Sequence, residues 1–486
     1  MGGNTHIIHR INLEINVPSI RLADQVKEDA IRLLNNEILP KLDKYLDTIE
    51  LADECFQFNQ LNIKLENLLE ENFEQEFSGL IEQAFHEKIE KVIELKDQSQ
   101  KEEVTKYTRE EQILESFIFF LKTGRRPWWS EKSGEVLTEQ NLSEILNNSS
   151  PEFQAELLSL LRENNIVLGR LLNQYSLQFI FQIIIALEKV QEEFAKDELT
   201  RKIILLFQNF SKKKNFTGFY LPIQLQSALK NIIMQLISRK RVYSEQQLSY
   251  KLDELSAKIA SLDPIDQTDL KSLFDEINEE VTLSDIENKE SFIFLEKQTA
   301  TETTTVESLK RSQKKTEEEE DGIFLNNAGL VLLYPFFESF LIDFDLLAEG
   351  QFKDTESQMV AIHLLHYLAT KEVFAAEYEL GMEKFLCGWD LDLFISKNIE
   401  LSPAMKDECE TLLLAAIRHW SALKSTSPDG LREGFLQREG KLILNDFQNR
   451  LIIENKAQDV LLSHLPWSYS MIKLPWMDGI LITEWI

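Results

Sequence analysis

Two histidines, His363 and His366, are three residues apart in a stretch with helical periodicity, and this spacing places both imidazole rings on one face of a helix. Such a pair can bind a metal ion when further ligands with defined spacing complete the site. Cys387, Cys409 and His419 follow, but no CxxC and no HExxH motif is present. We therefore interpret the pair as partly buried helix residues, each with a satisfied ring nitrogen, and we predict neither a metal nor a cofactor.

Other sequence patterns that support catalysis are missing. The phosphate-binding GxxxxGK[ST] loop, the dinucleotide-binding GxGxxG loop and the GxSxG pattern of a nucleophile elbow do not occur. Carboxylates are plentiful, with 82 Asp and Glu residues, so a pair of them says nothing about acid–base catalysis. The sequence therefore predicts that the protein is not an enzyme.

The segment TGRRPWWS, residues 123–130, combines cations and large aromatic rings, which are the residue types that anchor protein interfaces. Gly124 is expected to end the preceding helix, and the proline holds the two tryptophans on an extended segment. Two interpretations stay open: the tryptophans cover a helix end and pack inward, or the segment contacts a partner. The interface candidates here are Arg125, Arg126, Trp128 and Trp129.

The stretch from residue 417 to residue 444 has a similar ambiguity. Its Arg and Glu residues alternate in sign on a short predicted helix, as they would on an ion-paired, solvated helix face. Their density near a tryptophan favours an interface for the group as a whole. The candidates here are His419, Trp420, Arg432 and Arg438.

The triplet Leu-Pro-Trp occurs twice near the C-terminus and ends at Trp467 and Trp476. The residue before each proline is biased to an extended backbone, and each tryptophan can bury on the order of 200 Å². We predict that both tryptophans clamp the final strands onto helices around His419 and Trp420, with Trp485 closing the sheet. Trp467 and Trp476 are also interface candidates, since a docking role is the alternative.

These residues must be positioned by secondary structure, and residues 1–98 indicate an N-terminal α+β module. Alternating apolar residues over 9–17 predict a strand, and helical spacing follows over 20–39. A second alternating run over 56–66 is expected to pair with the first. A further helix is predicted over 68–98.

Residues 99–296 form the predicted helical middle region, which includes the GRRPWWS segment. Its first part, over 97–112, is interpreted as a solvated helix extension or hinge. The remainder has a nearly continuous helical pattern, which suits a stack or bundle of helices, with breaks at Pro151, Pro222 and Pro264. Residues 297–322 are rich in Thr and Glu, so we predict an acidic linker there.

Residues 323–486 predict a C-terminal α+β domain. Helices are expected over 357–370 and 403–424, the latter with Ser402 as its N-cap, and a short helix closed by Gly440 follows. The expected strands form a hairpin over 441–455 and two further strands over 469–474 and 479–485. The predicted fold class is therefore mainly α with α+β modules at both ends, a helical middle region and small mixed sheets at the N- and C-terminus.

Composition limits the class of partner and the location. The formal net charge is −30, which argues against nucleic acid because phosphate binding needs concentrated Lys and Arg. Three cysteines are too few for a disulfide scaffold and fit a reducing compartment. No apolar run approaches the ~20 residues that span a bilayer, and no signal peptide is predicted. We therefore expect a cytoplasmic protein without membrane insertion, and leave its incorporation into a larger particle open.

Nine short stretches of the sequence occur in the same order as in one known protein family. They are HIIHRINLEINVPS, LLNNEILPKLDKYLD, FNQLNIKLENL, GRRPWWS, NNAGLVLLYPFF, HLLHYLAT, EYELGMEKFLCG, HWSALKSTSPDGLREGFLQREGKL and LPWSYSMIKLPWM. Together they resemble the contractile injection system tape measure protein family, from phage-tail-like particles related to the antifeeding prophage and the Photorhabdus virulence cassettes. The resemblance covers residues 5–130 and 323–486, and the phrase over 419–442 is the most specific part of it.

The resemblance implies a role in assembling an inner tube and contractile sheath on a baseplate, without catalysis. The implied partners are inner-tube, baseplate or tube-tip proteins of the same particle. Both a length determinant and a scaffold fit this role, and a cytosolic chaperone for tube or effector subunits, absent from the mature particle, is the alternative. A ruler needs an extended segment, and only residues 131–296 could supply one, for about 250 Å at the helical rise.

Overall fold

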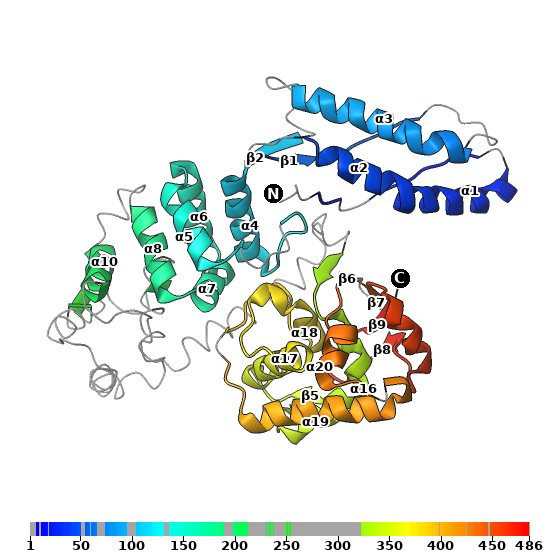
Figure 1. The fold of residues 1–486 in the computed structure, drawn as a ribbon. Coiled ribbons are helices and arrows are strands. Elements are labelled where there is room, and N and C mark those ends of the chain that lie inside the picture. The colour runs from blue at the N-terminus through cyan, green and yellow to red at the C-terminus, as the bar shows by residue number, and fades with distance from the viewer. Residues whose placement is uncertain are drawn as a thin grey trace. The chain divides into compact units, whose positions relative to one another are not determined.

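The computed structural model is drawn in Figure 1. It describes residues 6–8, 11–17, 19–49, 54–58, 60–65, 73–94, 104–130, 136–188, 198–211, 322–397, 399–423, 425–445 and 448–485, with scattered positions between 230 and 253. The predicted linker over 297–322 lies outside the described residues except for its last position. The predicted helix breaks at Pro222 and Pro264 lie outside them as well.

The chain divides into two compact units. Unit 1 comprises Met1–Phe117 and Pro127–Leu142, and unit 2 comprises Ile118–Arg126 and Ser143–Ile486. Each unit is described by itself below. The predicted division of the chain into four parts stays a prediction.

Helices supply the core of unit 1. They are α1 (Ile20–Leu33), a π-helical turn (Leu34–Ile38), α2 (Leu39–Leu46) and α3 (Phe73–Glu94). Their apolar faces form one buried cluster made of Ala30, Leu33, Ile38, Leu42, Phe77, Phe85 and Ile89. Pro40 is the second residue of α2, which continues directly from the π-helical turn, so its missing N–H removes one hydrogen bond from this continuous helical run.

The strand pairing of unit 1 differs from the sequence-based expectation. β1 (Glu54–Phe58) pairs antiparallel with β2 (Val104–Thr108), and residues 11–17 form neither strand nor helix. The expected pairing between the two alternating runs is therefore wrong, as is the helical or hinge interpretation of the segment that forms β2. Alternation shows that a segment can present one apolar face, but it does not identify the partner strand. The β-branched and aromatic residues of VTKYT favour a strand.

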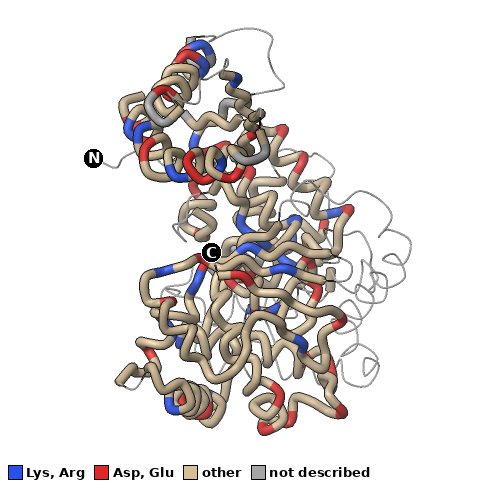
Figure 2. Tube along the Cα trace, turned by 90° about the vertical axis from the view of Figure 1, so that its right-hand side faces the viewer, with Lys and Arg blue, Asp and Glu red and all other residues tan. Residues whose placement is uncertain are grey.

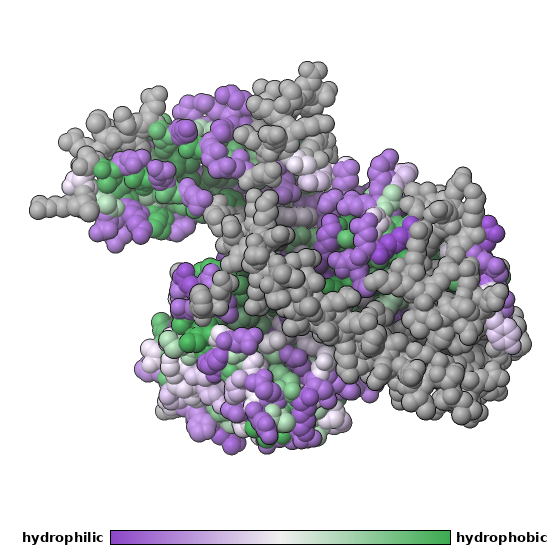
Figure 3. All heavy atoms as spheres, turned by 180° about the vertical axis from the view of Figure 1, so that it is seen from behind, coloured by the Kyte–Doolittle hydropathy of each residue, from purple (hydrophilic) through white to green (hydrophobic). Residues whose placement is uncertain are grey.

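Apolar residues remain on the surface of unit 1. Ile7, Ile8, Ile11 and Leu13 are exposed, whereas Ile15 packs against the helical cluster. From behind, hydrophobic residues are visible between hydrophilic ones on this unit (Figure 3).

The helical part of unit 2 consists of short helices. α4 (Arg109–Thr123) crosses from unit 1, and it is followed by α5 (Glu139–Asn148), α6 (Pro151–Glu163), α7 (Asn165–Gln174), α8 (Leu177–Glu188) and α10 (Glu198–Ser211). Side-chain caps explain two of the breaks: Ser150 accepts a hydrogen bond from Phe153 N–H, and Asn164 accepts from Ile166 N–H. Pro151 therefore begins α6 at the break that the sequence predicted.

Residues 322–485 of unit 2 contain further helices. The α-helices are α16 (Tyr334–Asp343), α17 (Thr355–Thr370), α18 (Gly381–Leu386), α19 (Pro403–His419) and α20 (Pro428–Leu431). The 3-10 and π turns are η3 (Ala328–Leu333), η4 (Glu377–Glu379), η5 (Ser421–Leu423), η6 (Arg432–Leu436) and η7 (Ala457–His464). Ser402 caps α19 by accepting from Met405 N–H, as predicted. The short helical stretch ends at Leu436 rather than at Gly440, because Gly440 is the first residue of β6.

A mixed five-stranded sheet lies in the same part of unit 2. Its strands are β3 (Ile323–Leu325), β6 (Gly440–Ile443), β7 (Gln448–Ile453), β8 (Met471–Ile472) and β9 (Ile480–Trp485), in the order β3-β6-β7-β9-β8. β7 and β9 are parallel, and the other neighbours are antiparallel. A small hairpin of β4 (Leu347–Ala348) and β5 (Gln351–Phe352) lies apart from it. The predicted 441–455 hairpin and the two last predicted strands are confirmed.

The fold class is confirmed: the described chain is mainly helical, with small sheets in its N-terminal and C-terminal parts. No helix within the described ranges is long and apolar enough to cross a bilayer. Basic and acidic positions are interspersed over the described trace in Figure 2. This distribution agrees with the argument against nucleic-acid binding.

Candidate functional site

A buried ionic cluster joins the helical part of unit 2 to its sheet-containing part. Arg170 lies on α7 within the apolar sequence NIVLGRLLNQ and is fully buried. Its Nε donates to Glu377 Oε2 at 3.0 Å, across 207 positions of sequence. Its two terminal nitrogens donate to the carbonyl oxygens of Leu121 and Asp392. A buried arginine is stable only when its donors are satisfied, and this one binds three separate segments.

Lys384 completes the cluster from α18. Its Nζ donates to Glu377 Oε1 at 2.6 Å and to the Leu393 carbonyl at 2.8 Å. Burial lowers the pKa of Lys384, and the charge and hydrogen bond of Glu377 oppose that shift. Each oxygen of Glu377 therefore binds one cation, and we call Arg170, Glu377 and Lys384 the junction cluster.

Further hydrogen bonds and tight contacts lie around the junction cluster. Gln174 donates to the Ile395 carbonyl at 2.8 Å and accepts from Glu377 N–H at 3.0 Å. Gly124 ends α4, as predicted, with a φ of 72°, and a side chain there would collide with Glu377. A side chain at Gly169 would collide with the ring of Phe394. Both glycines therefore leave space that a side chain of another segment, Glu377 or Phe394, occupies.

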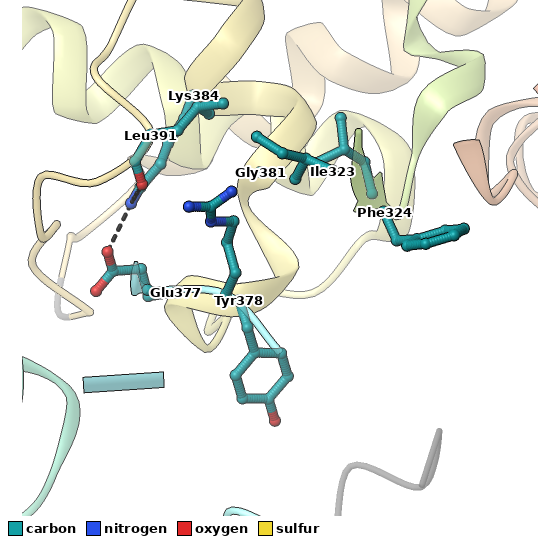
Figure 4. A pocket seen from close by; sticks show the side chains of 10 residues that line it. Ile323, Phe324, Glu377, Tyr378, Gly381, Lys384 and Leu391 are labelled. Atoms are coloured by element: carbon teal, nitrogen blue, oxygen red, sulfur yellow. Dashed lines mark hydrogen bonds and ion pairs between the residues drawn. The ribbon is translucent and has the colours of Figure 1, made fainter. Parts of the chain in front are cut away.

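A small pocket lies beside the cluster, and Figure 4 shows Glu377, Lys384, Tyr378 and Phe324 around it. Its other lining residues include Arg125, residues of β3 and Gly381 of α18. The pocket has room for about one water molecule. It is therefore too small for an organic substrate.

The residues of the GRRPWWS segment take different positions. Arg125 donates to Asp392 Oδ1 at 3.1 Å, next to the junction cluster, and the Arg126 guanidinium lies 4.4 Å from the centre of the Tyr378 ring. Trp128 and Trp129 are half-buried in a turn. The two arginines thus have contacts within unit 2. A role of the four residues in binding a partner stays a prediction.

The candidates between residues 417 and 444 are mostly core residues. Trp420 is buried and donates to the Leu461 carbonyl at 3.1 Å, whereas His419 is exposed at the end of α19. Arg432 is buried between Glu410 and Asp429, and Arg438 is buried with Asp459 at 2.6 Å. The solvated-face interpretation of the two arginines is therefore wrong. Their carboxylate partners lie on other turns or elements, which the local charge alternation does not reveal.

The three C-terminal tryptophans pack inward at separate places. Trp467 donates to the Leu332 carbonyl at 2.8 Å and packs edge-on against Phe336, whose ring lies 6.3 Å from that of His419. Trp476 instead packs on the end of α18, where it donates to the Leu386 carbonyl at 2.8 Å. The predicted clamp around His419 and Trp420 is therefore wrong for Trp476, whereas Trp467 is separated from His419 by one aromatic ring, that of Phe336. Trp485 was expected to close the sheet. It lies in β9, whereas β8 is the outermost strand on that side of the sheet.

His363 and His366 are both buried on α17 and make different hydrogen bonds. His363 Nε2 lies 2.8 Å from the Ser396 carbonyl oxygen, and burial lowers its pKa to about 4. His366 Nδ1 lies 3.2 Å from Glu383 Oε1. Burial works against the charged form of His366, but its hydrogen bond to Glu383 and the surrounding carboxylates outweigh burial and raise its pKa.

The thiols near these histidines are poorly suited to nucleophilic attack or to metal binding. Burial raises the pKa of Cys409 to about 12 and that of Cys387 well above its ordinary value, so both stay protonated. No group of three His, Cys, Asp or Glu side chains within the described ranges could hold a metal ion. The arrangement is that of a packed core.

The low pKa of His363 predicts an effect of pH on stability. In the unfolded chain this histidine has a pKa near 6.5, so the unfolded state binds a proton between about pH 6.5 and pH 4 while the folded state does not. His363 should therefore contribute a decrease of about 3 kcal/mol to the free energy of unfolding over this interval as pH falls. Urea unfolding of the full chain at each pH measures this decrease.

His363→Gln keeps a donor for the Ser396 carbonyl but removes the titration, so its stability should fall less steeply below pH 6.5 than that of the parent. His419→Gln, at the exposed end of α19, is the matched control and should follow the parent curve. Equal slopes for His363→Gln and the parent would mean that His363 is already charged in the folded state.

Comparison with known proteins decides the family. The sequence model of the contractile injection system tape measure protein family matches residues 5–485. The chain belongs to this family. The match includes the helical middle region, where individual phrases showed no specific resemblance. No curated protein and no solved structure matches the chain.

The tape measure family is a structural family that is not known to be enzymatic. In this member, His363 and His366 each make one ring-nitrogen hydrogen bond, to the Ser396 carbonyl and to Glu383. Membership supports a role in the assembly of a phage-tail-like particle. The junction cluster is the feature of this tape measure protein that the sequence did not indicate. The only local signal is a charged residue on an apolar face, at Arg170.

Proposed function

We propose that this chain is a non-enzymatic scaffold for assembling the inner tube of a contractile injection system, and that it acts by binding tube, baseplate or tube-tip proteins. Family membership supports the assembly role. The observation that carries the choice of a scaffold over an extended ruler is the junction between Arg170 and Glu377.

The junction brings together the two ends of a long chain segment. Residues 171–376 begin beside Arg170 and end beside Glu377, and these two side chains are in contact at 3.0 Å. A ruler converts chain length into distance only if the ends of the measuring segment move apart. Separating these ends would break the hydrogen bonds of Arg170 and Gln174 to the sheet-containing part and expose their buried surroundings to water, which opposes the separation. With the junction closed, added length in this segment enlarges the loop between the two sides of the junction. It does not extend the distance that the chain spans.

Lengthening that loop tests the proposal. Duplicating residues 265–290 in a strain that makes the particles should leave the tube length unchanged, because the duplication lies in the region that could act as a ruler and between the two sides of the junction. A ruler would lengthen the tube by about 40 Å if the added segment were helical, and by up to about 90 Å if it were fully extended. Electron microscopy of purified particles measures tube length directly.

Two controls complete the test. A deletion of the whole gene should remove or sharply reduce particles, and particles of normal length and yield in its absence would exclude an assembly role. Mass spectrometry of mature particles should detect the chain at low copy number. If the chain is absent from particles but forms a soluble complex with one tube or effector subunit, it is a chaperone instead.

A further inference from the structure

The pocket beside the junction cluster is lined by both charged and apolar residues. Glu377 and Lys384 face each other on one side of it, and Ile323 lies on the other side (Figure 4). The pocket has room for about one water molecule, and a water in a protein interior needs about two to four polar partners. The polar atoms around the pocket therefore decide what it can bind.

Arg125 supplies a hydrogen-bond donor to this pocket. Its Nη2 donates to Asp392 Oδ1 at 3.1 Å, and its side chain as a whole is 15% exposed. The Nε atom of Arg125 is buried, however, and no atom of the described residues accepts a hydrogen bond from it. Leaving a buried N–H group without an acceptor is costly, so nearly all such groups have a protein or water partner. The Nε–H group of Arg125 therefore needs an acceptor.

Lys384 supplies a second donor. Its ammonium group has three N–H bonds, and two of them donate to Glu377 Oε1 at 2.6 Å and to the Leu393 carbonyl at 2.8 Å. The remaining contact of Nζ, with the Leu391 carbonyl, is 3.5 Å long, whereas such hydrogen bonds usually measure about 2.7–3.2 Å. Leu391 also lines the pocket. A water molecule bound to both groups would replace this weak contact by two shorter hydrogen bonds.

The acceptors at the pocket distinguish water from an ion. Each oxygen of Glu377 accepts one hydrogen bond from a cation, and a carboxylate can accept about four in total. A halide could accept from Arg125 and Lys384, but the Glu377 carboxylate and the Leu391 carbonyl would repel it. A metal cation would be repelled by Arg125 and Lys384. Water both donates and accepts, so it matches all of these groups.

We propose that this pocket binds one structural water molecule, which accepts a hydrogen bond from Arg125 Nε and donates one to Glu377. A bridging water is nearly as favourable in enthalpy as a direct hydrogen bond. Through it, Arg125 becomes a fourth member of the junction cluster. Arg125 directly follows Gly124, which ends α4, so the water fixes the start of the GRRPWWS segment to the sheet-containing part of unit 2. The inference does not depend on the scaffold role.

Crystals of the full chain grown in sodium bromide test which species occupies the pocket. The electron density should show one peak within about 3.2 Å of both Arg125 Nε and an oxygen of Glu377. Data collected at the bromine absorption edge should show no anomalous signal at this peak. An anomalous peak would mean that a halide fills the pocket, and no peak at all would mean that the pocket is dry. Either result overturns the proposal.

Arg125→Lys tests the role of the Nε–H group. Lysine keeps a cation near Asp392 but lacks this donor, so the water loses one hydrogen bond and its peak should lose occupancy. Arg126→Lys is the matched control, because it makes the same substitution at the next position, where the guanidinium lies over the Tyr378 ring. It should leave the peak unchanged. Thermal unfolding of both variants checks that they fold. Equal occupancy in Arg125→Lys and the parent would contradict the link between Arg125 and the junction cluster.

Discussion

Glu377→Gln is expected to lower the free energy of unfolding by about 3–5 kcal/mol, because it leaves two buried cations facing a neutral amide. Arg170 and Lys384 are 0% and 2% exposed, so bulk water does not solvate either cation when Glu377 loses its charge. Lys384 already has a lowered pKa, and losing the opposing carboxylate lowers it further. Urea unfolding of the full chain at neutral pH measures the loss of stability.

Two further variants separate the ionic effect from a general one. Glu433→Gln removes an exposed carboxylate on η6 and should change stability by less than about 0.5 kcal/mol. Combining Glu377→Gln with Lys384→Met removes one of the two unpaired charges, so the double variant should regain part of the loss. If Glu377→Gln costs less than about 1 kcal/mol, water or another anion compensates the two cations and the junction is weaker than its geometry indicates.

The local parts of the fold could be predicted from the sequence. The N-cap Ser402, the helix-ending Gly124 and the alternating hairpin over 441–455 each depend on residues within a few positions of one another. For such features the physical cause lies in the same stretch of sequence, whether it is a capping hydroxyl, a positive φ or a period of two. The phrases at both ends of the chain also indicated the family. The match over residues 5–485 confirmed it.

Long-range partners could not be predicted in this way. Arg170 binds a carboxylate 207 positions away, and nothing near Glu377 in sequence indicates that partner. The same limit applies to Arg438, which the charge alternation places on a solvated face. The carboxylate that binds it belongs to Asp459 on η7. This limit also explains the error at β1, because alternation does not specify the partner strand. Periodicity predicts which face of an element is buried, but only three-dimensional packing determines what it is buried against.

Trp476→Ala is the second change expected to have a large effect, with a loss of about 3–5 kcal/mol in the free energy of unfolding. The indole ring is buried beside Phe352, at 5.2 Å between ring centres, and fixes the segment before β9 to the end of α18. Alanine leaves a cavity and also leaves the Leu386 carbonyl without its donor. For a chain with two units, the loss should appear in the unfolding transition of unit 2, as followed by thermal melting with near-ultraviolet circular dichroism.

Trp476→Phe distinguishes the packing of the ring from its hydrogen bond. Phenylalanine keeps most of the buried ring but lacks the N–H group, so this variant should lose only about 1–2 kcal/mol. Particle yield then decides between a core residue and a docking residue. If Trp476 acts through stability alone, yield should fall with the stability of each variant, and alanine should reduce it more than phenylalanine. A variant as stable as the parent that still fails to support assembly would instead place Trp476 in contact with a partner protein.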